Sequence, residues 1–284
     1  MAQRAEQLKD SIDRHLHQLG SLEELSDERY HVTHECFEAA SNQRRLIIDW
    51  LAMLADNTSF PAGRATRILS VGCGGGVMDQ KITDLFAAHA EGLSLVGIDP
   101  NRQHTAAFET LFSTEGFEVQ VHTGMFEDYS AAMAFDLIHF VHCLYYFEHI
   151  EPELRKAAGM LAPGGALVIL QAPNEDLNHL ADRVWKKQFN QSAWYSDDVL
   201  ATLDRLGLET TCTRLDARVD VTECLDPNSD LGVDILDFIV QAETAKFSPA
   251  FCASLRDSLR SICTRQGTRF IAEHPVDAIV VRKT

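Results

Sequence analysis

The order of apolar and polar positions divides the chain into a helical N-terminal region and a longer region of alternating strands and helices. Between Leu46 and Leu54, apolar residues recur at helical spacing, which gives this stretch one apolar face. The pattern ends at Phe60 and Pro61. We therefore expect residues 1–60 to be mainly helical.

From Arg67 onward, short apolar runs alternate with segments of helical pattern. The apolar runs are residues 67–72, 93–99, 118–124, 135–142 and 165–172, and the helical segments between them are 78–90, 102–113 and 150–161. Strands and helices that alternate in this way predict an α/β fold with a doubly wound, mostly parallel sheet and right-handed crossovers.

The regularity drops after Pro173. Residues 174–190 are polar around Trp185, and residues 196–207 indicate a helix with Ser196 as N-cap and Gly207 as stop signal. Residues 208–221 alternate like strands, residues 225–270 look helical, and residues 276–283 form a last apolar run. A final antiparallel strand on a parallel sheet would suit this ending.

Composition excludes several function classes. The chain of 284 residues has 25 Lys plus Arg and 42 Asp plus Glu, a net charge of −17 that disfavours binding to nucleic acid or to an anionic membrane. The seven Cys form no C-x-x-C pair and the twelve His lack ligand spacing, so we expect neither a disulfide framework nor a metal site. Since no signal peptide or membrane-length apolar run is visible, we expect a cytoplasmic protein.

The candidate chemistry lies at residues 69–79, LSVGCGGGVMD, where the first strand meets the first helix. Gly72, Gly74 and Gly76 allow a tight turn and let a ligand approach main-chain N–H groups. Asp99 ends the second apolar run, where a carboxylate can accept hydrogen bonds from both hydroxyls of an adenosine ribose. This order predicts a nucleoside-type cofactor at the carboxyl ends of the strands.

Two cofactor classes compete for this loop. A dinucleotide enzyme would need G-x-G-x-x-G, and Val77 interrupts that pattern. S-adenosylmethionine has no phosphate to hold and carries a sulfonium cation, which suits an acidic chain. A dehydrogenase therefore ranks third among the functions that the sequence suggests, and absence of NAD binding in a titration would exclude it.

The chain resembles class I S-adenosylmethionine-dependent methyltransferases, and more narrowly the histamine N-methyltransferase family. The resemblance runs from Tyr30 to the end of the chain. The segments that carry it are SVGCGGGVMDQKI (70–82), FDLIHFVHCLYYFEHI (135–150), VWKKQ (184–188), SDDVLATLDRLGLE (196–209) and DILDFIV (234–240). It implies a Rossmann-like, seven-stranded sheet with a smaller helical substrate region.

The resemblance also implies a division of the chain. Residues 1–60 would cap the substrate site, residues 61–172 would form the cofactor-binding core, and residues 173–206 would form a lid that contains Trp185. Residues 207–284 would supply the C-terminal strands, with a helical insertion at 225–274 that completes the pocket.

Site residues follow from the same resemblance. The implied cofactor site comprises Gly72, Gly74, Gly76, Asp99, His104, Thr123 and Val141, with Asp99 in place of the family's Glu and His104 in place of its Gln. The implied substrate pocket comprises Tyr30, Phe37, Gln43, His142, Tyr145, Tyr146, Trp185, Phe238 and His274. Aromatic walls of this kind suit a flat heteroaromatic ring or a cationic amine.

Three substrate positions depart from the family. Gln43, His142 and His274 stand where the family has Glu, Gln and Asn. Without the Glu, the ammonium group of histamine lacks its expected counter-ion, so a zwitterionic or carboxylate-bearing imidazole, or another small nucleophile, fits at least as well. His142 and Tyr146 are the candidate catalytic residues, because a His can act as a base and a Tyr can shape the transfer channel.

The sequence thus predicts a monomeric N-methyltransferase for a small imidazole or amine metabolite. The alternatives are an O-methyltransferase, an enzyme acting on an amino acid or another amine, and a non-catalytic protein that binds S-adenosylmethionine.

Overall fold

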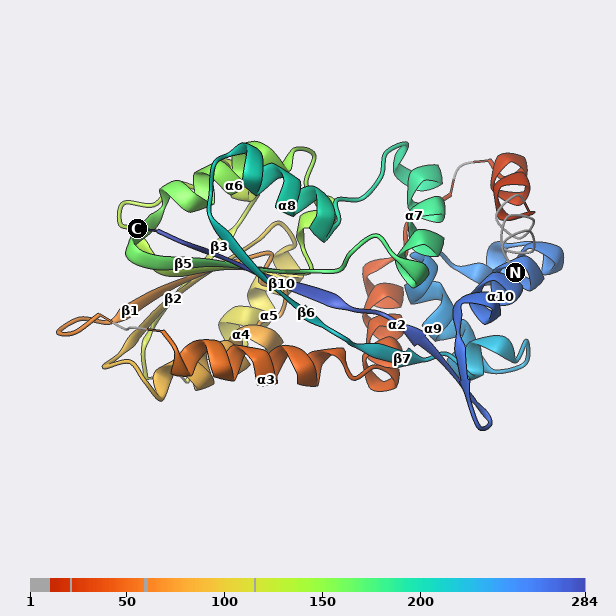
Figure 1. Ribbon diagram of the computed structural model, residues 1–284, viewed down its shortest axis with the longest axis horizontal. Coiled ribbons are helices and arrows are strands. Elements are labelled where there is room, and N and C mark those ends of the chain that lie inside the picture. Colours follow the sequence, from red (N-terminus) through yellow and green to blue (C-terminus); the bar gives the residue numbers. More distant parts are fainter. Residues whose placement is uncertain (1–10, 21, 59–60, 115, 284) are drawn as a thin grey trace. The chain divides into compact units, whose positions relative to one another are not determined.

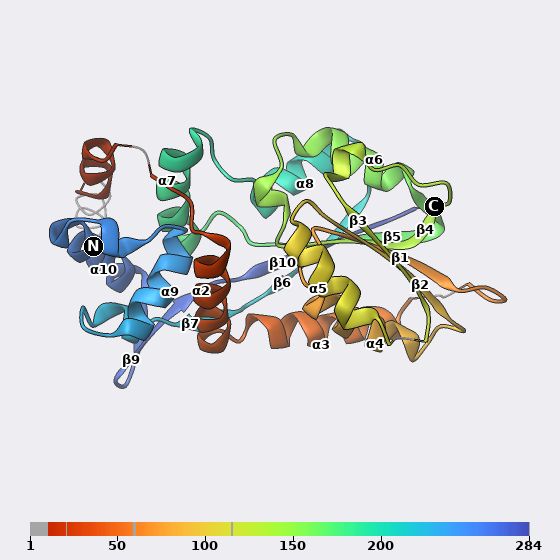
Figure 2. The same cartoon turned by 180° about the vertical axis from the view of Figure 1, so that it is seen from behind.

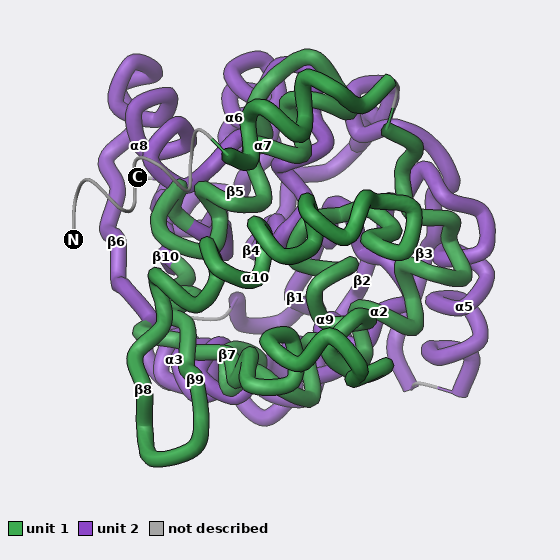
Figure 3. The backbone as a smooth tube through the Cα atoms, turned by 90° about the vertical axis from the view of Figure 1, so that its right-hand side faces the viewer, with its two compact units in different colours: residues 1–44, 173–193, 216–276 green, residues 45–172, 194–215, 277–284 purple. Residues whose placement is uncertain are grey.

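Two compact units make up the chain in the computed structural model, which describes residues 11–20, 22–58, 61–114 and 116–283. Unit 1 comprises residues 1–44, 173–193 and 216–276, and unit 2 comprises residues 45–172, 194–215 and 277–284 (Figure 3). Each unit therefore combines segments that are distant in sequence. The expected helical pattern of residues 1–10 and the break at Phe60 lie outside the described residues.

Unit 2 contains a seven-stranded sheet in the order β3-β2-β1-β4-β5-β10-β6. Strands β1 to β5 pair in parallel, and β10 pairs with β5 in the antiparallel direction. The strands are β1 (Thr66–Val71), β2 (Leu93–Asp99), β3 (Glu118–Thr123), β4 (Phe135–Val141), β5 (Leu161–Gln171), β6 (Thr210–Leu215) and β10 (Val276–Arg282). This topology confirms the predicted doubly wound sheet and its antiparallel last strand.

Helices cover both faces of this sheet. In Figures 1 and 2, α3, α4 and α5 lie on one face, and α6 and α8 lie on the other. The helices are α3 (Gln43–Asp56), α4 (Val77–Ala87), α5 (Arg102–Phe112), α6 (Ile150–Gly159) and α8 (Ser196–Arg205), with short 3-10 turns at Phe126–Asp128 and Leu144–Tyr146. The apolar face predicted for residues 46–54 is buried on α3, where Ile47 and Leu51 are among the least exposed residues.

Unit 1 is mainly helical and has its own core. Its elements are a helix through residues 11–18, α2 (Asp27–Ala40), α7 (Asp176–Phe189), α9 (Asp230–Val240), α10 (Pro249–Ile262), the 3-10 turns Glu223–Leu225 and Thr244–Lys246, and a small sheet in the order β7 (Arg218–Asp220), β9 (Arg269–Glu273) and β8 (Thr264–Gln266). Leu180 of α7, Leu236 of α9 and Leu255 of α10 are buried together in this core. No described helix is both long enough and apolar enough to cross a membrane.

The structure differs from three local expectations. Helix α8, expected within the lid of residues 173–206, buries Val199 and Leu203 in the core of unit 2. Tyr195, not Ser196, is its N-cap, and the Ser196 hydroxyl instead donates to Asp277. The expected helical insertion at 225–274 contains the β8–β9 hairpin, because residues 264–273 pair as antiparallel strands.

Candidate active site

The glycine loop after β1 has the backbone that its sequence predicts. Gly72, Gly74 and Gly76 have φ values of 67°, 52° and 84°, a region that side chains other than glycine rarely adopt. A Cβ on Gly72 would lie 2.5 Å from Cβ of Cys143, so the loops after β1 and β4 approach each other closely. By contrast, a Cβ on Gly74 would meet no atom within 4 Å. The loop therefore packs closely against the loop after β4 at Gly72 and has open space beside Gly74.

Asp99, at the end of β2, is held against this loop. Its carboxylate accepts hydrogen bonds from the Gly74 N–H at 3.0 Å and from the Asn101 N–H at 2.9 Å. Nδ1 of His104 lies 3.4 Å from the same carboxylate. Burial alone raises the pKa of Asp99, but these hydrogen bonds, led by that from His104, outweigh it and lower the pKa below its usual value. Asp99 is therefore ionised at neutral pH.

The predicted cofactor residues end neighbouring strands of one sheet. Asp99 ends β2, Thr123 ends β3 and Val141 ends β4, and the glycine loop follows β1, which lies between β2 and β4. The hydroxyl of Thr123 lies 2.7 Å from that of Thr105 on α5. Parallel strands place these positions at one edge of the sheet, where open α/β folds bind ligands.

His142, Tyr145 and Tyr146 follow β4 in unit 2. His142 has a φ of 51°, a left-handed conformation that is uncommon for a residue with a side chain. Its Nδ1 lies 3.2 Å from the Tyr145 hydroxyl, which accepts a hydrogen bond from the Ala172 N–H at 3.0 Å. Tyr146 is 54% exposed. Tyr145 thus anchors the His142 ring, whereas Tyr146 is accessible.

The remaining predicted substrate residues belong to unit 1, where most of them form a cluster of rings. Phe238 of α9 contacts Tyr30 and Phe37 of α2 at ring-centroid distances of 5.6 and 4.8 Å, and Phe37 meets His274 edge-on at 5.3 Å. Burial lowers the pKa of His274 to about 4, so its imidazole is neutral at pH 7. Residues predicted from widely separated segments are therefore brought together within this unit.

Gln43 and Trp185 have other roles in unit 1. Gln43 is buried, and its side-chain amide donates to the backbone carbonyl of His274 at 3.2 Å. Gln43 therefore positions the backbone at His274. The ring of Trp185, on α7, contacts Phe189 at a centroid distance of 4.3 Å.

His34 is a member of the ring cluster that sequence analysis missed. Its ring stacks on Tyr30 at 5.9 Å and contacts Phe238 at 5.2 Å. Burial, reinforced by the charge of Arg44, lowers the pKa of His34 to about 4. The signal in the sequence was the spacing of Tyr30 and His34, four residues apart on one helix face.

A buried pair under the glycine loop was also missed. Nε2 of His139, on β4, lies 3.4 Å from Oδ1 of Asp79, in the first turn of α4, and both side chains are at most 4% exposed. Burial raises the pKa of Asp79 to about 7 despite a hydrogen bond from Ser70, and lowers that of His139 to about 4. The pair therefore favours uncharged forms and links the start of α4 to the sheet. No group of three or more metal-ligating side chains occurs in the described part of the chain.

Comparison with known proteins identifies the family of the chain. A family model described as a methyltransferase domain matches residues 39–213. The chain belongs to the methyltransferase domain family. This finding, together with the fold, confirms the prediction of a class I S-adenosylmethionine-dependent methyltransferase.

Curated relatives of this methyltransferase include two that are named for their substrates. Histamine N-methyltransferase of Mus musculus is 25% identical over 203 residues, which cover 64% of this chain and 67% of the relative. Carnosine N-methyltransferase 2 of Gallus gallus is 28% identical over 219 residues, which cover 70% of this chain and 66% of the relative. The matches thus span about two thirds of the length of these relatives.

Solved structures of similar fold agree with the family. The YcgJ protein from Bacillus subtilis superposes with a TM-score of 0.56 at 14% identity, covering 82% of this chain and 97% of that protein. The plantazolicin methyltransferase BpumL, solved in complex with SAH, superposes with a TM-score of 0.54 at 14% identity, covering 98% of each chain. At such low identity these likenesses concern the fold of the methyltransferase.

Proposed function

We propose that this methyltransferase transfers a methyl group from S-adenosylmethionine to a ring nitrogen of a small imidazole metabolite. The observation that carries the proposal is the ring cluster of unit 1, in which Phe238 contacts Tyr30, Phe37 and the neutral His34. Aromatic walls suit a flat heteroaromatic ring. The relatives named for histamine and carnosine, both of which contain imidazole, support the same class of acceptor.

The residues at the carboxyl edge of the unit 2 sheet fit the methyl donor. Asp99 accepts two main-chain N–H groups and a hydrogen bond from His104, and an ionised carboxylate has about four acceptor sites, so one site remains for a ribose hydroxyl. Gly74 leaves open space beside the loop, where a bound nucleoside can approach the backbone. Gly72, Gly76, His104, Thr123 and Val141 would complete this binding site. When bound, S-adenosylmethionine supplies a methyl group on a positively charged sulfur.

The protein's own contribution is alignment and exclusion of water. If the Tyr145 hydroxyl donates a hydrogen bond to Nδ1 of His142, the neutral His142 ring carries its proton at Nε2. That N–H then donates to the acceptor and orients it. A neutral imidazole nitrogen already has a lone pair for the new N–C bond, so no base must act before transfer. The resulting imidazolium loses the proton on its other ring nitrogen to solvent water.

The charges around the ring cluster support an acceptor other than histamine. Glu38 forms an ion pair with Arg44 at 2.6 Å. Asp234 and Asp237 form ion pairs with Arg29 at 2.6 and 2.7 Å. Each of these carboxylates is already held by an arginine, Asp234 and Asp237 by the same one, so none of them is a dedicated partner for an ammonium group. An imidazole whose side chain is neutral or carries its own carboxylate fits better.

The first test is a panel of acceptors incubated with the protein and S-adenosylmethionine, with products read by mass. The panel contains histamine, histidine, thiolated histidines, carnosine, imidazole-acetate and simple amines. We expect a mass gain of one methyl group on an imidazole, with histamine among the poorer imidazole acceptors. Methylation of simple amines alone would refute the acceptor class. Measured cofactor binding without any product would favour a non-catalytic binding protein.

Replacing Tyr145 by phenylalanine should reduce kcat about tenfold, because the His142 ring loses the hydroxyl that holds it, a change of about 1.4 kcal/mol in the barrier. The affinity for S-adenosylmethionine should stay unchanged, since Tyr145 is not among the predicted cofactor residues. Tyr129→Phe is the matched control, because Tyr129 is half-buried like Tyr145 but follows β3 and not β4. Equal kinetics for Tyr145→Phe and wild type would remove the anchoring role.

A further inference from the structure

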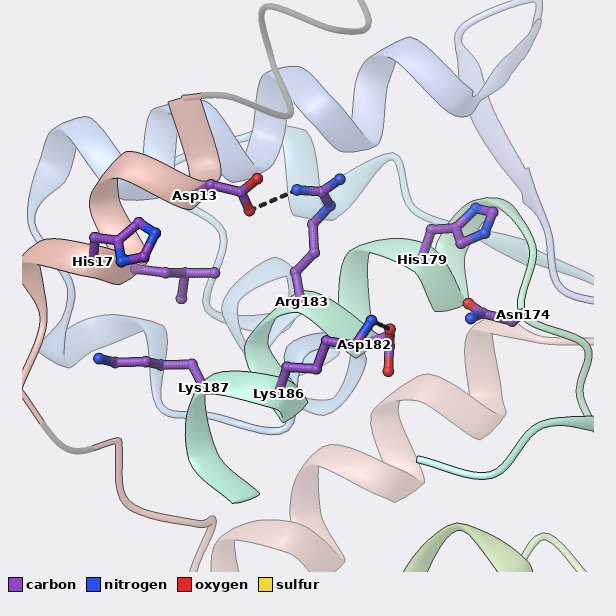
Figure 4. A pocket seen from close by; sticks show the side chains of 9 residues that line it. Asp13, His17, Asn174, His179, Asp182, Arg183, Lys186 and Lys187 are labelled. Carbon is purple, nitrogen blue, oxygen red and sulfur yellow. Dashed lines mark hydrogen bonds and ion pairs between the residues drawn. The ribbon is translucent and has the colours of Figure 1, made fainter. Parts of the chain in front are cut away.

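A groove of about 660 Å³ lies within unit 1, between α7 and the helix through residues 11–18 (Figure 4). One helix contributes Asp13 and His17, and α7 contributes His179 and Arg183 with neighbours on the same face. Facing helices usually meet through apolar stripes. Here polar side chains face each other across a volume in the range of small-molecule sites.

The spacing of residues on α7 explains why its polar face lines the groove. Residues 179, 182, 183, 186 and 187 line it, and this spacing of three and four places them on one side of the helix. Leu177, Leu180 and Val184 point instead into the apolar core of unit 1. The segment VWKKQ, whose Trp185 is buried, thus directs Lys186 and Lys187 to the groove. No step of the proposed methyl transfer uses these two lysines.

The groove has more positive than negative groups. Arg183 pairs with Asp13 at 2.6 Å, and the two side chains turn toward each other in Figure 4. Lys186 pairs with Asp182, also at 2.6 Å. Lys187 is half-buried and, among the described residues, has neither a hydrogen bond nor an ion pair. The lining therefore has three permanent cations against two carboxylates, in a chain whose net charge is −17.

Two imidazoles add further hydrogen-bond donors to the groove. His17 and His179 line the groove, and neither has a partner within the part of the chain that the structure describes. A histidine donates a hydrogen bond in either protonation state and adds a positive charge when protonated. Ammonium, guanidinium and imidazole groups on facing walls match the charged oxygens of phosphate and carboxylate groups.

We propose that this groove is a second binding site, for a small organic anion with two or more phosphate or carboxylate groups. Lys187 would make the main unshared contact, and Arg183 and the two histidines would supply further donors. The proposal concerns unit 1 residues that the methyl-transfer mechanism does not use, so it stands independently of the acceptor.

The test titrates the full chain with tripolyphosphate and, separately, with citrate, by calorimetry at low and at physiological salt. We expect saturable binding of one equivalent of at least one probe. Lys187→Gln should weaken it about fivefold to tenfold, because one ammonium–anion contact at a protein surface contributes about 1 kcal/mol or more. Preference for one probe identifies the anionic group. An unchanged circular dichroism spectrum and urea unfolding curve show that the variant is folded.

The matched control is Lys81→Gln, which removes an exposed lysine of α4 in unit 2. It should leave binding of both probes unchanged. Equal weakening by Lys81→Gln and Lys187→Gln would mean that the anions respond only to total charge, which would overturn the site. Absence of saturable binding of either probe would overturn it as well.

Discussion

Replacing Asp99 with asparagine should weaken binding of S-adenosylmethionine by about one hundredfold. An amide has one acceptor oxygen, whereas the carboxylate uses one oxygen for the Gly74 N–H and the other for the Asn101 N–H. The amide nitrogen must therefore face one of these donors, and the charge that strengthens hydrogen bonds from ribose hydroxyls is lost. Weakening the hydrogen bond to the ribose and the hydrogen bond from one main-chain N–H by about 1.4 kcal/mol each gives this factor.

Calorimetric titration of the cofactor measures the change, with Asp84→Asn as the control because Asp84 is an exposed residue of α4. The pH dependence gives a second readout. Because the pKa of Asp99 is lowered, the wild-type carboxylate stays charged from neutral pH down to that lowered pKa, and affinity falls only when the pH drops through it. The variant lacks this titration. A loss of less than threefold would exclude Asp99 from the cofactor site.

The sequence was most informative where periodicity and chain order act together. Short apolar runs predicted β1, β2 and β4, and the loop at Gly72 and the acidic end at Asp99 followed from their positions after β1 and on β2. These features are local, because a strand and the loop after it are adjacent in sequence. Parallel pairing of β1 with β2 then brings Asp99 to the glycine loop, where its carboxylate accepts a hydrogen bond from the Gly74 N–H.

Features that depend on distant segments could not be predicted. The side-chain amide of Gln43 donates to the backbone carbonyl of His274, 231 positions away in the sequence. No local pattern around Gln43 could therefore indicate that this residue positions the backbone at His274. The Asp79–His139 pair connects a helix to a strand through a buried contact. Helix α8 has the same amphipathic pattern whether it forms a lid or packs on a sheet, and only the burial of Val199 and Leu203 decides between these.

Replacing Gly72 with alanine should destabilise unit 2 by about 3 kcal/mol and greatly weaken cofactor binding. The new Cβ would lie 2.5 Å from Cβ of Cys143, a distance that real Cβ atoms essentially never show. Relief requires movement of the loop after β1 or the loop after β4. Such overpacking costs about 1–3 kcal/mol, and a left-handed conformation without glycine adds about 1–2 kcal/mol. Urea unfolding and cofactor titration measure the two effects.

Two further variants separate the contact from the backbone strain. Gly74→Ala places a Cβ at φ 52° with no atom within 4 Å, so it should lose only the conformational term of about 1–2 kcal/mol. Adding Cys143→Gly to Gly72→Ala removes the Cβ and Sγ atoms that the new methyl group meets, so the double variant should be about 1 kcal/mol more stable than the sum of the two single losses predicts. If Gly72→Ala and Gly74→Ala cost the same, or if the losses of Gly72→Ala and Cys143→Gly simply add, the close approach of the two loops does not control stability. If the stabilities follow the expected order, position 72 requires glycine because the loop after β4 leaves no room for a Cβ. Position 74 requires glycine only because of its backbone conformation.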